Sequence, residues 1–180
     1  INMVRPIFRN AIRYDKVKVH NRKYAFFQPS NGAITPNGEI YFAPMVFRED
    51  FHITRVSEQH FFIHEMVHVW QYQMGYPVKA QGIASAIGYG YDYTIKPGMQ
   101  LSDFPMEGQA NIIADYAMYL LFGSALHYSH KKYYKPATPQ SDLQAVLSKF
   151  ILNPLDKSNL PNFANSACET DPTSVQCLTK

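Results

Sequence analysis

The sequence predicts an α+β fold in a single domain over residues 1–180, and three observations carry this prediction. The length lies within the range of about 100–200 residues that one domain usually has. The stretch 16–45 is rich in β-branched and aromatic residues interrupted by turn signals, so residues 1–53 are expected to be mainly β. Apolar side chains then follow helical spacing, so residues 54–151 are expected to be mainly helical and residues 152–180 to form an irregular tail.

The N-terminal strands are expected at Val17–Phe27 and Glu39–Phe42. Pro29 and the pairs Asn31-Gly32 and Asn37-Gly38 interrupt this part of the chain, and such residues are typical of tight turns. The sequence therefore predicts a small sheet or hairpin region before the helices.

Two long helices and two short ones are expected in the second part of the chain. An N-cap residue before each periodic segment and a glycine after it mark the ends of the long helices. The expected bounds are an N-cap at Thr54 or Ser57 and an end at Met74-Gly75 for the first long helix, and Pro105–Phe122 for the second, with Ser102 or Asp103 as N-cap and Gly123 as the end. The short helices are expected at Lys79–Ile87, inside the loop-rich stretch Pro77–Gly98, and at Ser141–Ile151.

Composition and charge exclude several classes of protein. Hydrophobic residues make up 46% of the chain and charged residues 17%, against a usual charged share of about 25%, which excludes a disordered chain. Lys and Arg number 17 against 14 Asp and Glu, and the cations are scattered along the chain, so no nucleic-acid partner is expected. No apolar run approaches the roughly 18 residues of a membrane span, and no signal-peptide pattern is present in this segment.

The two cysteines leave two alternatives open. Cys168 and Cys177 are nine residues apart in the tail, where either a disulfide or two free thiols are compatible with the sequence. A disulfide would indicate an oxidising destination.

A metal-binding motif lies inside the first long helix. His64-Glu65-Met66-Val67-His68 has the HExxH pattern, whose two imidazoles at i and i+4 lie on one helical face and can share a metal ion. Glu65 is turned by about 100° from His64, so its carboxylate can reach a water on the metal without being a ligand. Histidines satisfied within the core are the alternative, but three ionisable groups this close on a buried helix are costly unless a cation compensates them.

His60 extends the same helical face by one more turn. At 1.5 Å per residue it lies about 12 Å from His68 along the helix axis, so both cannot bind one tetrahedral ion. We expect His60 at the surface or in hydrogen bonding around the site.

A catalytic zinc needs a third protein ligand, and Glu107 is the expected one. The metzincin pattern is excluded because Gln71 and Met74 stand where that pattern has Gly and His. Glu107, Asn111 and Asp115 repeat at i, i+4 and i+8, beside a stripe of alanines that would let the two long helices pack closely.

We therefore expect one Zn²⁺ ion held by His64, His68 and Glu107. Asp115 or Asn111 would accept the free imidazole N–H of a ligand histidine. Three other residues remain open as third ligands: Asp92, Asp103 and His127. Among Tyr89, Tyr91 and Tyr93, one could donate a hydrogen bond to an oxyanion, although packing is the commoner role of such tyrosines.

These motifs resemble the zincin metallopeptidases, in particular the gluzincins, in which a Glu on a later helix completes HExxH. Residues 34–42, 62–71 and 107–110 are similar to the zincin domains at the C-terminus of type VI secretion spike proteins of the valine-glycine-repeat class and to related bacterial toxins. The resemblance implies a zincin-like fold, in which a small N-terminal β-region packs on an active-site helix and a second ligand-bearing helix.

The resemblance also implies a function. It is that of a zinc metallopeptidase in which a zinc-activated water attacks the peptide bond and Glu65 is the general base. By the same resemblance, the strand Glu39–Phe42 would hold an extended peptide substrate. The domain would be a secreted antibacterial effector acting in the periplasm of target cells, with a peptide or protein substrate, a secretion spike and an immunity protein or chaperone as partners. Thermolysin-type enzymes have an Asp four residues after the ligand Glu, where this sequence has Asn111.

Two alternative functions remain open. A zinc amidase acting on peptidoglycan peptides would need the same ligands. A non-catalytic binding domain would use the metal for structure, although structural zinc sites are usually closed by four ligands and rich in Cys.

Overall fold

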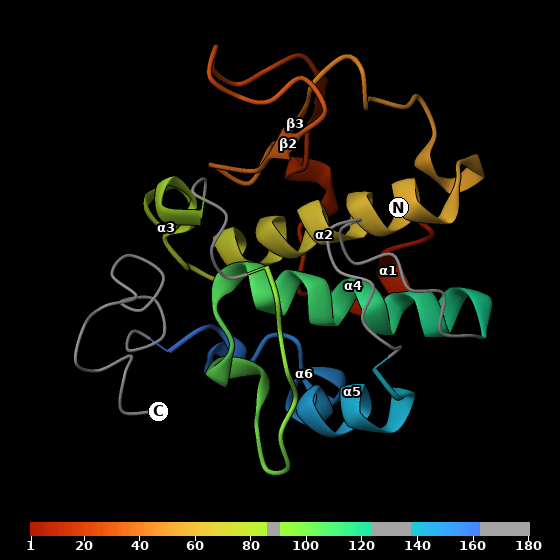
Figure 1. Ribbon diagram of the computed structural model, residues 1–180, viewed down its shortest axis with the longest axis vertical. Coiled ribbons are helices and arrows are strands. Elements are labelled where there is room, and N and C mark those ends of the chain that lie inside the picture. The colour runs from red at the N-terminus through yellow and green to blue at the C-terminus, as the bar shows by residue number, and fades with distance from the viewer. Residues whose placement is uncertain (86–90, 124–137, 163–180) are drawn as a thin grey trace.

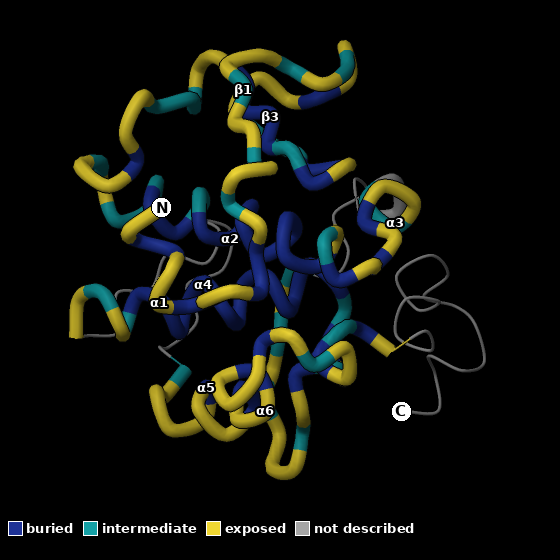
Figure 2. The backbone as a smooth tube through the Cα atoms, turned by 180° about the vertical axis from the view of Figure 1, so that it is seen from behind, coloured by how far each residue is buried: buried dark blue, intermediate teal, exposed yellow. Residues whose placement is uncertain are grey.

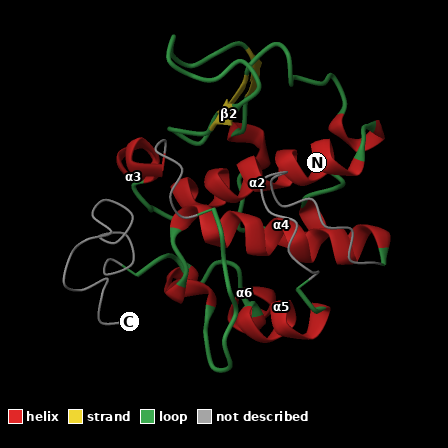
Figure 3. Ribbon diagram, in the orientation of Figure 1, coloured by secondary structure: helices red, strands yellow, loops and turns green. Residues whose placement is uncertain are grey.

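The computed structural model describes residues 1–85, 91–123 and 138–162 (Figure 1). Its architecture is mixed α+β, as predicted, with a small three-stranded sheet and a larger helical part (Figure 3). The helices are α1 (Arg5–Phe8), α2 (Val56–Gln73), α3 (Val78–Ser85), α4 (Met106–Phe122), α5 (Gln140–Val146) and α6 (Ser148–Leu152). The strands are β1 (Val19–Asn21), β2 (Ala33–Ile34) and β3 (Ile40–Phe42), and four 3₁₀ turns, η1 to η4, lie at Tyr14–Lys16, Phe51–Ile53, Leu101–Asp103 and Lys157–Asn159.

The sheet has the strand order β1-β3-β2. β1 runs parallel to β3 with Val19 opposite Ile40, and β2 runs antiparallel to β3 with Ala33 opposite Phe42. β3 is thus the central strand, and all three of its residues are buried. The turn between β2 and β3 places Gly38, at φ +77°, against the ring of Tyr72 on α2, where any Cβ atom would clash.

The predicted strand Val17–Phe27 is too long, because only Val19–Asn21 pairs. Beyond Asn21 the chain leaves the sheet and folds around the buried side chain of Gln28. β2 was not predicted, since two residues are too few to show the alternation of a strand. Residues 1–53 therefore consist of three short strands, α1, η1, η2 and turns, rather than being mainly β.

α2 begins and ends within two residues of the prediction. Its N-cap is Arg55 rather than Thr54 or Ser57, and the Glu58 carboxylate accepts a hydrogen bond from the Arg55 backbone N–H at 3.3 Å. Eleven of its eighteen residues are buried, and Trp70 is fully so. Its indole N–H donates to the backbone carbonyl of Pro154 at 2.8 Å, which ties the helix to the segment after α6.

α4 occupies almost the predicted range. Pro105 is its N-cap, while Ser102 and Asp103 belong to the 3₁₀ turn before it. Gly123 ends the helix in the left-handed conformation at φ +65°, which favours glycine. Ala110, Ala114 and Ala117 are fully buried, so α4 and α2 can approach closely.

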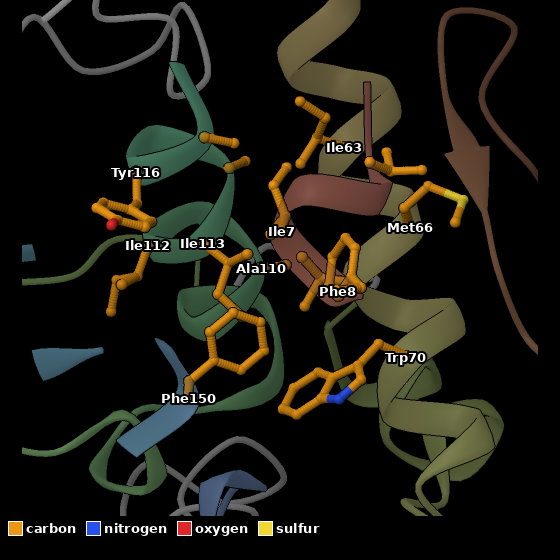
Figure 4. Packing of buried hydrophobic residues seen from close by; sticks show 14 of the residues in the cluster. Ile7, Phe8, Ile63, Met66, Trp70, Ala110, Ile112, Ile113, Tyr116 and Phe150 are labelled. Atoms are coloured by element: carbon orange, nitrogen blue, oxygen red, sulfur yellow. The ribbon is translucent and has the colours of Figure 1, made fainter. Parts of the chain in front are cut away.

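The main hydrophobic core lies where α1 and α6 meet the pair of long helices. Figure 4 shows Phe8 of α1 and Phe150 of α6 close to Trp70 of α2. Phe150 contacts the Trp70 ring edge to face at 5.2 Å between ring centroids. α1, α2, α4 and α6 thus contribute side chains to one hydrophobic core.

The remaining predicted elements differ in detail. The short helix expected at 79–87 is α3, and the one expected at 141–151 is divided at Leu147 into α5 and α6. The tail of the prediction includes η4, and its part from residue 163 onward, with Cys168 and Cys177, lies outside the described residues. None of the helices that the structure describes has the length and hydropathy of a membrane span.

Candidate metal centre

Three donor atoms from two helices converge in the interior. His64 and His68 come from the middle of α2, and Glu107 comes from the first turn of α4. The His64 Nε2 and His68 Nε2 atoms lie 3.0 and 3.2 Å from Glu107 Oε2, and 3.2 Å from each other. All three side chains are buried, and among the described residues they form the group of His and carboxylate donors that could hold a metal ion. The structure thus brings together the three ligands expected from the sequence.

The register of the two helices creates this convergence. Residue numbers rise along α2 as they fall along α4, so the helices are antiparallel, and facing residues pair as His60 with Asp115, His64 with Asn111 and His68 with Glu107. Each step is four residues on both helices, which is close to one helical turn. The polar stripe of α4 therefore pairs with the histidine stripe of α2 once in every helical turn, and each such facing pair is called a rung.

Two amides orient the histidines. His64 Nδ1 lies 2.8 Å from Asn111 Oδ1, and His68 Nδ1 lies 2.8 Å from Gln71 Oε1. Each amide nitrogen has an acceptor of its own, because Asn111 Nδ2 donates to the Tyr91 carbonyl at 2.6 Å and Gln71 Nε2 donates to the Met106 carbonyl at 3.2 Å. The amide oxygens must then face the imidazoles and accept from Nδ1–H, so both Nε2 atoms face Glu107 and can accept a metal ion once they are deprotonated.

A metal ion fits this donor set. Two imidazole lone pairs and a carboxylate oxygen meet at close range, and they repel one another unless a cation lies between them. Ligand atoms around a tetrahedral zinc ion are about 3.4 Å apart, given Zn–N and Zn–O distances of about 2.0–2.2 Å. The three separations here are only slightly shorter, at 3.0–3.2 Å. The three donor atoms are therefore spaced as three ligands of a tetrahedral ion would be, at slightly shorter distances.

The electrostatics of the pair His68 and Glu107 also demand positive charge. Burial disfavours a charged His68, but the charge and hydrogen bond of Glu107, the charge of Glu65 and the hydrogen bond to Gln71 together outweigh burial and raise the pKa of His68 to about 9. Burial likewise tends to raise the pKa of Glu107, yet His68 and His64 hold it well below its usual range. A proton or a metal cation is therefore stabilised next to this carboxylate.

Glu65 lies beside the metal group but outside it. Its side chain is buried, and its Oε2 atom accepts a hydrogen bond from Thr35 Oγ1 at 2.7 Å. Thr35 directly follows β2, so the sheet contributes a residue to the site. Thr35 was not predicted as a site residue, because a lone Thr in a turn-rich segment carries no metal-site signal.

Asp115 has a different partner from the one expected. It does not accept from a ligand histidine; its Oδ1 atom lies 2.8 Å from His60 Nε2, and its Oδ2 atom accepts from the Tyr93 hydroxyl. His60 is therefore buried and not at the surface. Burial, followed by the nearby Asp115 carboxylate, raises the pKa of Tyr93. Asn111 alone of the two candidates contacts a ligand histidine.

The tyrosines and the other candidate ligands are also placed. The Tyr93 hydroxyl is committed to Asp115, whereas the Tyr91 ring stacks against His64 with 6.1 Å between ring centroids. Within the described residues, neither Asp92 nor Asp103 belongs to the metal group, and the Asp103 carboxylate accepts from the Gln100 N–H instead. Tyr89 and His127 lie outside the described residues.

The fold and this centre together define a candidate metalloprotein domain, with a His-His-Glu group between two antiparallel helices. No known protein-family model matches the chain. Over 122 residues, 64% of the chain, it is 33% identical to the type VI secretion system spike protein VgrG2b of Pseudomonas aeruginosa. The matched segment is only 12% of that spike protein's length.

A solved structure points to the same relative. The effector domain of Pseudomonas aeruginosa VgrG2b superposes with a TM-score of 0.62 and 26% sequence identity, covering 83% of this chain and 77% of that domain. The chain is therefore homologous to the effector domain of a type VI secretion spike protein. The resemblance to domains of such spike proteins is confirmed to this extent.

Proposed function

We propose that this chain is a zinc-dependent metallopeptidase domain that acts as a type VI secretion effector. The observation that carries the enzymatic part is the convergence of two imidazole Nε2 atoms and the Glu107 carboxylate, with the Glu65 carboxylate buried beside them. The effector part rests on homology to the effector domain of VgrG2b.

Each residue of the site has a distinct role in the proposed reaction. His64, His68 and Glu107 would hold one zinc ion, which when bound supplies Lewis acidity and makes water a nucleophile near neutral pH. Glu65 takes the proton from the attacking water and later gives it to the leaving amine. Thr35 holds the Glu65 carboxylate in one orientation through its hydroxyl.

The edge of the sheet nearest the site is β2, not the strand Glu39–Phe42 expected to bind substrate. β3 is paired on both sides and buried, so it cannot pair with a peptide. The Gly32 carbonyl accepts from the Ala43 N–H, and the alternation of an antiparallel ladder then turns the N–H and C=O of Ala33 away from β3. An extended peptide added along β2 would lead to Thr35 and Glu65.

Variants of two residues test the enzymatic part. We expect Glu65→Gln to keep a zinc-to-protein ratio near one but to lower hydrolysis of unfolded casein by about 10²–10⁴-fold, because the ligands remain and the base is lost. Glu107→Ala should lose the zinc itself. Hydrolysis by Glu65→Gln at the wild-type rate would contradict the general-base role, and a wild-type protein without zinc after metal-replete purification would contradict the metal site.

The two alternatives predict other outcomes of the same assays. Release of peptides from purified peptidoglycan without any cleavage of casein would indicate the amidase. A fourth protein ligand in a zinc-loaded crystal structure, with no hydrolysis of either substrate, would indicate a structural metal and a binding domain.

The effector role has its own test. VgrG2b is a spike protein with an effector domain, and we propose that this domain is likewise carried by a spike, acts in the periplasm of target cells and is neutralised by an immunity protein or chaperone. Growth of a sensitive bacterium should stop when the domain is exported to the periplasm and continue when it is kept in the cytoplasm. Equal toxicity in both compartments would contradict the periplasmic site of action.

A further inference from the structure

The connection between β1 and β2, residues 22–32, forms a projecting loop with an aromatic tip. In Figure 1 it lies beyond the sheet, on the side away from α5 and α6, and Figure 2 shows the same end largely exposed. Phe26 is 94% exposed and Phe27 is 70% exposed, and their rings meet edge to face at 5.5 Å between ring centroids. Two adjacent aromatic rings are thus held in solvent.

Hydrogen bonds of a buried side chain anchor the base of this loop. Gln28 is buried; its side-chain oxygen accepts from the Tyr24 N–H at 2.8 Å, and its nitrogen donates to the carbonyls of Tyr41 and Gly32 at 2.8 and 3.1 Å. The Tyr24 ring packs against the Tyr41 ring at 5.0 Å. The loop therefore presents Phe26 and Phe27 from a preorganised support.

The excess of positive over negative charge falls in the segment that contains this loop. Residues 16–38 contain four cations and no acid, namely Lys16, Lys18, Arg22 and Lys23. The rest of the chain has 17 − 4 = 13 cations against 14 acids, a net charge of −1, so this segment accounts for the whole excess of +3. The cations are scattered along the whole sequence, but they outnumber the acids only because of this one segment.

The fold adds a further cation near the loop, and the acids at the two borders of the segment are paired, Asp15 with Lys16 and Glu39 with Lys18. The Lys79 ammonium of α3 lies 5.7 Å from the centroid of the Tyr24 ring, and the Arg22 guanidinium lies 5.9 Å from the centroid of the Tyr41 ring. The carboxylate of Glu39, at the border of the segment, is paired with Lys18 at 3.0 Å and with His20 at 2.9 Å. Cations thus surround the base of an apolar tip.

We propose that this loop is a membrane-contacting loop for bilayers that contain anionic phospholipid. Phe26 and Phe27 insert among the headgroups and the first part of the acyl chains, while Arg22, Lys23 and Lys79 contact the phosphates. Apolar insertion and charge attraction are the two signals that reversible binding to a bilayer requires, and each alone binds weakly. An apolar protein pocket would need the two rings but not the surrounding cations. Contact of this kind requires neither the metal ion nor hydrolysis.

Vesicle flotation tests the proposal on the whole chain. Vesicles of equal parts phosphatidylglycerol and phosphatidylcholine should bind the protein at least about tenfold more tightly than vesicles of phosphatidylcholine alone. Phe26→Ser with Phe27→Ser, and separately Arg22→Gln with Lys23→Gln, should each weaken binding to the anionic vesicles by about tenfold or more. Both double variants keep the buried Gln28 anchor, so their circular dichroism and Tm should match the wild type.

A matched control removes two equally exposed apolar side chains elsewhere. Ile53 and Leu152 are 81% and 80% exposed, and Ile53→Ser with Leu152→Ser should leave vesicle binding unchanged. An indole at the tip reports insertion, because the single native tryptophan, Trp70, is fully buried. Phe27→Trp should therefore show a blue shift of emission with anionic vesicles and quenching by brominated lipid.

Four results would overturn the proposal. They are wild-type binding to phosphatidylcholine alone as tight as to anionic vesicles, unchanged binding by the Phe26→Ser, Phe27→Ser variant, no emission shift in Phe27→Trp, and tighter binding of a single-stranded oligonucleotide than of vesicles. The last result, if it depended on the same two rings, would assign the loop to base stacking instead.

Discussion

Single hydrogen bonds decide what each ionisable group of the site can do. The amides of Asn111 and Gln71 fix the imidazole tautomers, and the Thr35 hydroxyl fixes one oxygen of Glu65. A ligand or base held in this way loses little freedom when it acts, because its orientation is set before substrate arrives. Replacing a single oxygen atom in one of these hydrogen bonds should therefore change the activity of the site.

Thr35→Val removes the hydroxyl and keeps the shape. We expect it to lower kcat for peptide hydrolysis by about 10- to 100-fold with little change of KM, because Glu65 is misoriented while the metal ligands and the sheet edge remain. Thr35→Ser, which keeps the hydroxyl, should stay within about threefold of the wild type. Steady-state kinetics with zinc content measured alongside checks this, and a Thr35→Val enzyme with wild-type kcat would contradict it.

Zinc affinity should depend on pH through His68. Because the pKa of His68 in the metal-free protein is raised to about 9, this imidazole holds a proton below that pH, and zinc must displace it. Apparent affinity should therefore fall by up to about tenfold for each pH unit below 9 and level off above it. Competition with a chromophoric chelator at pH 7 and pH 8, corrected for the chelator's own protonation, measures this; equal affinities at the two pH values would contradict it.

At the scale of the elements, the register between α2 and α4 decides which polar residues of the two helices pair. His60 with Asp115, His64 with Asn111 and His68 with Glu107 form three successive polar rungs, of which only two concern the metal. The third rung buries a histidine and a carboxylate away from the donors and also holds Tyr93. We infer that this rung stabilises the packing of α2 against α4 without contacting the residues of the metal group.

Asp115→Ala tests the third rung. It removes the partner of two buried groups, His60 and Tyr93, each worth about 1–3 kcal/mol when left unpaired, so we expect the free energy of unfolding to fall by about 3 kcal/mol. Zinc content should stay near one, because Asp115 does not contact a ligand. Urea unfolding of the zinc-loaded protein measures the change.

The exposed Asp142 on α5 provides a control, since Asp142→Ala should change the free energy of unfolding by less than about 0.5 kcal/mol. If the free energy of unfolding of Asp115→Ala fell by less than about 1 kcal/mol, the structural role of the third rung would be contradicted. Loss of zinc at an unchanged free energy of unfolding would contradict it as well.

The helices were more predictable than the strands, for a physical reason. Eighteen residues of α2 and seventeen of α4 repeat their pattern several times, so their bounds came out within two residues. β2 has two residues, and Val17–Phe27 shows β-type composition although most of it serves as a loop. The caps were mispredicted because Arg55 and Pro105 follow the local geometry of the entering chain rather than side-chain capping preference.

At the scale of the whole molecule, the metal site joins the two long helices across the interior. Without zinc, only a proton on His68 offsets the repulsion among the three buried atoms, which lie 3.0–3.2 Å apart. A proton carries less positive charge than a zinc ion, so zinc should stabilise the packing of α2 on α4 further. We therefore expect metal binding and folding to be coupled.

Removal of zinc should lower the Tm of the protein by about 10 °C, because an ion bound at a thousand times its Kd stabilises the fold by about 4 kcal/mol. Scanning calorimetry before and after chelation, with zinc measured in both samples, checks this. Glu107→Ala, which should already lack zinc, provides the control whose Tm does not respond to the chelator. An unchanged wild-type Tm after verified zinc loss would contradict the coupling.

The sequence by itself determined the features that repeat within one helix. The spacing of His64 and His68 places both imidazoles on one face, and the stripe of Glu107, Asn111 and Asp115 is likewise a property of a single helix, because residues four apart are neighbours on any α-helix. The same local rule placed the small alanines beside that stripe. These relations need no knowledge of the rest of the chain.

Only the tertiary structure decided which residues of different elements meet. It paired Asp115 with His60 rather than with a ligand, set Thr35 against Glu65, made β2 the edge strand, and placed Lys79 beside Tyr24. The physical reason is that contacts between elements depend on register and approach, and a shift of one turn would exchange every partner along α2 and α4. That register follows from the packing of the whole core and is not contained in any local pattern.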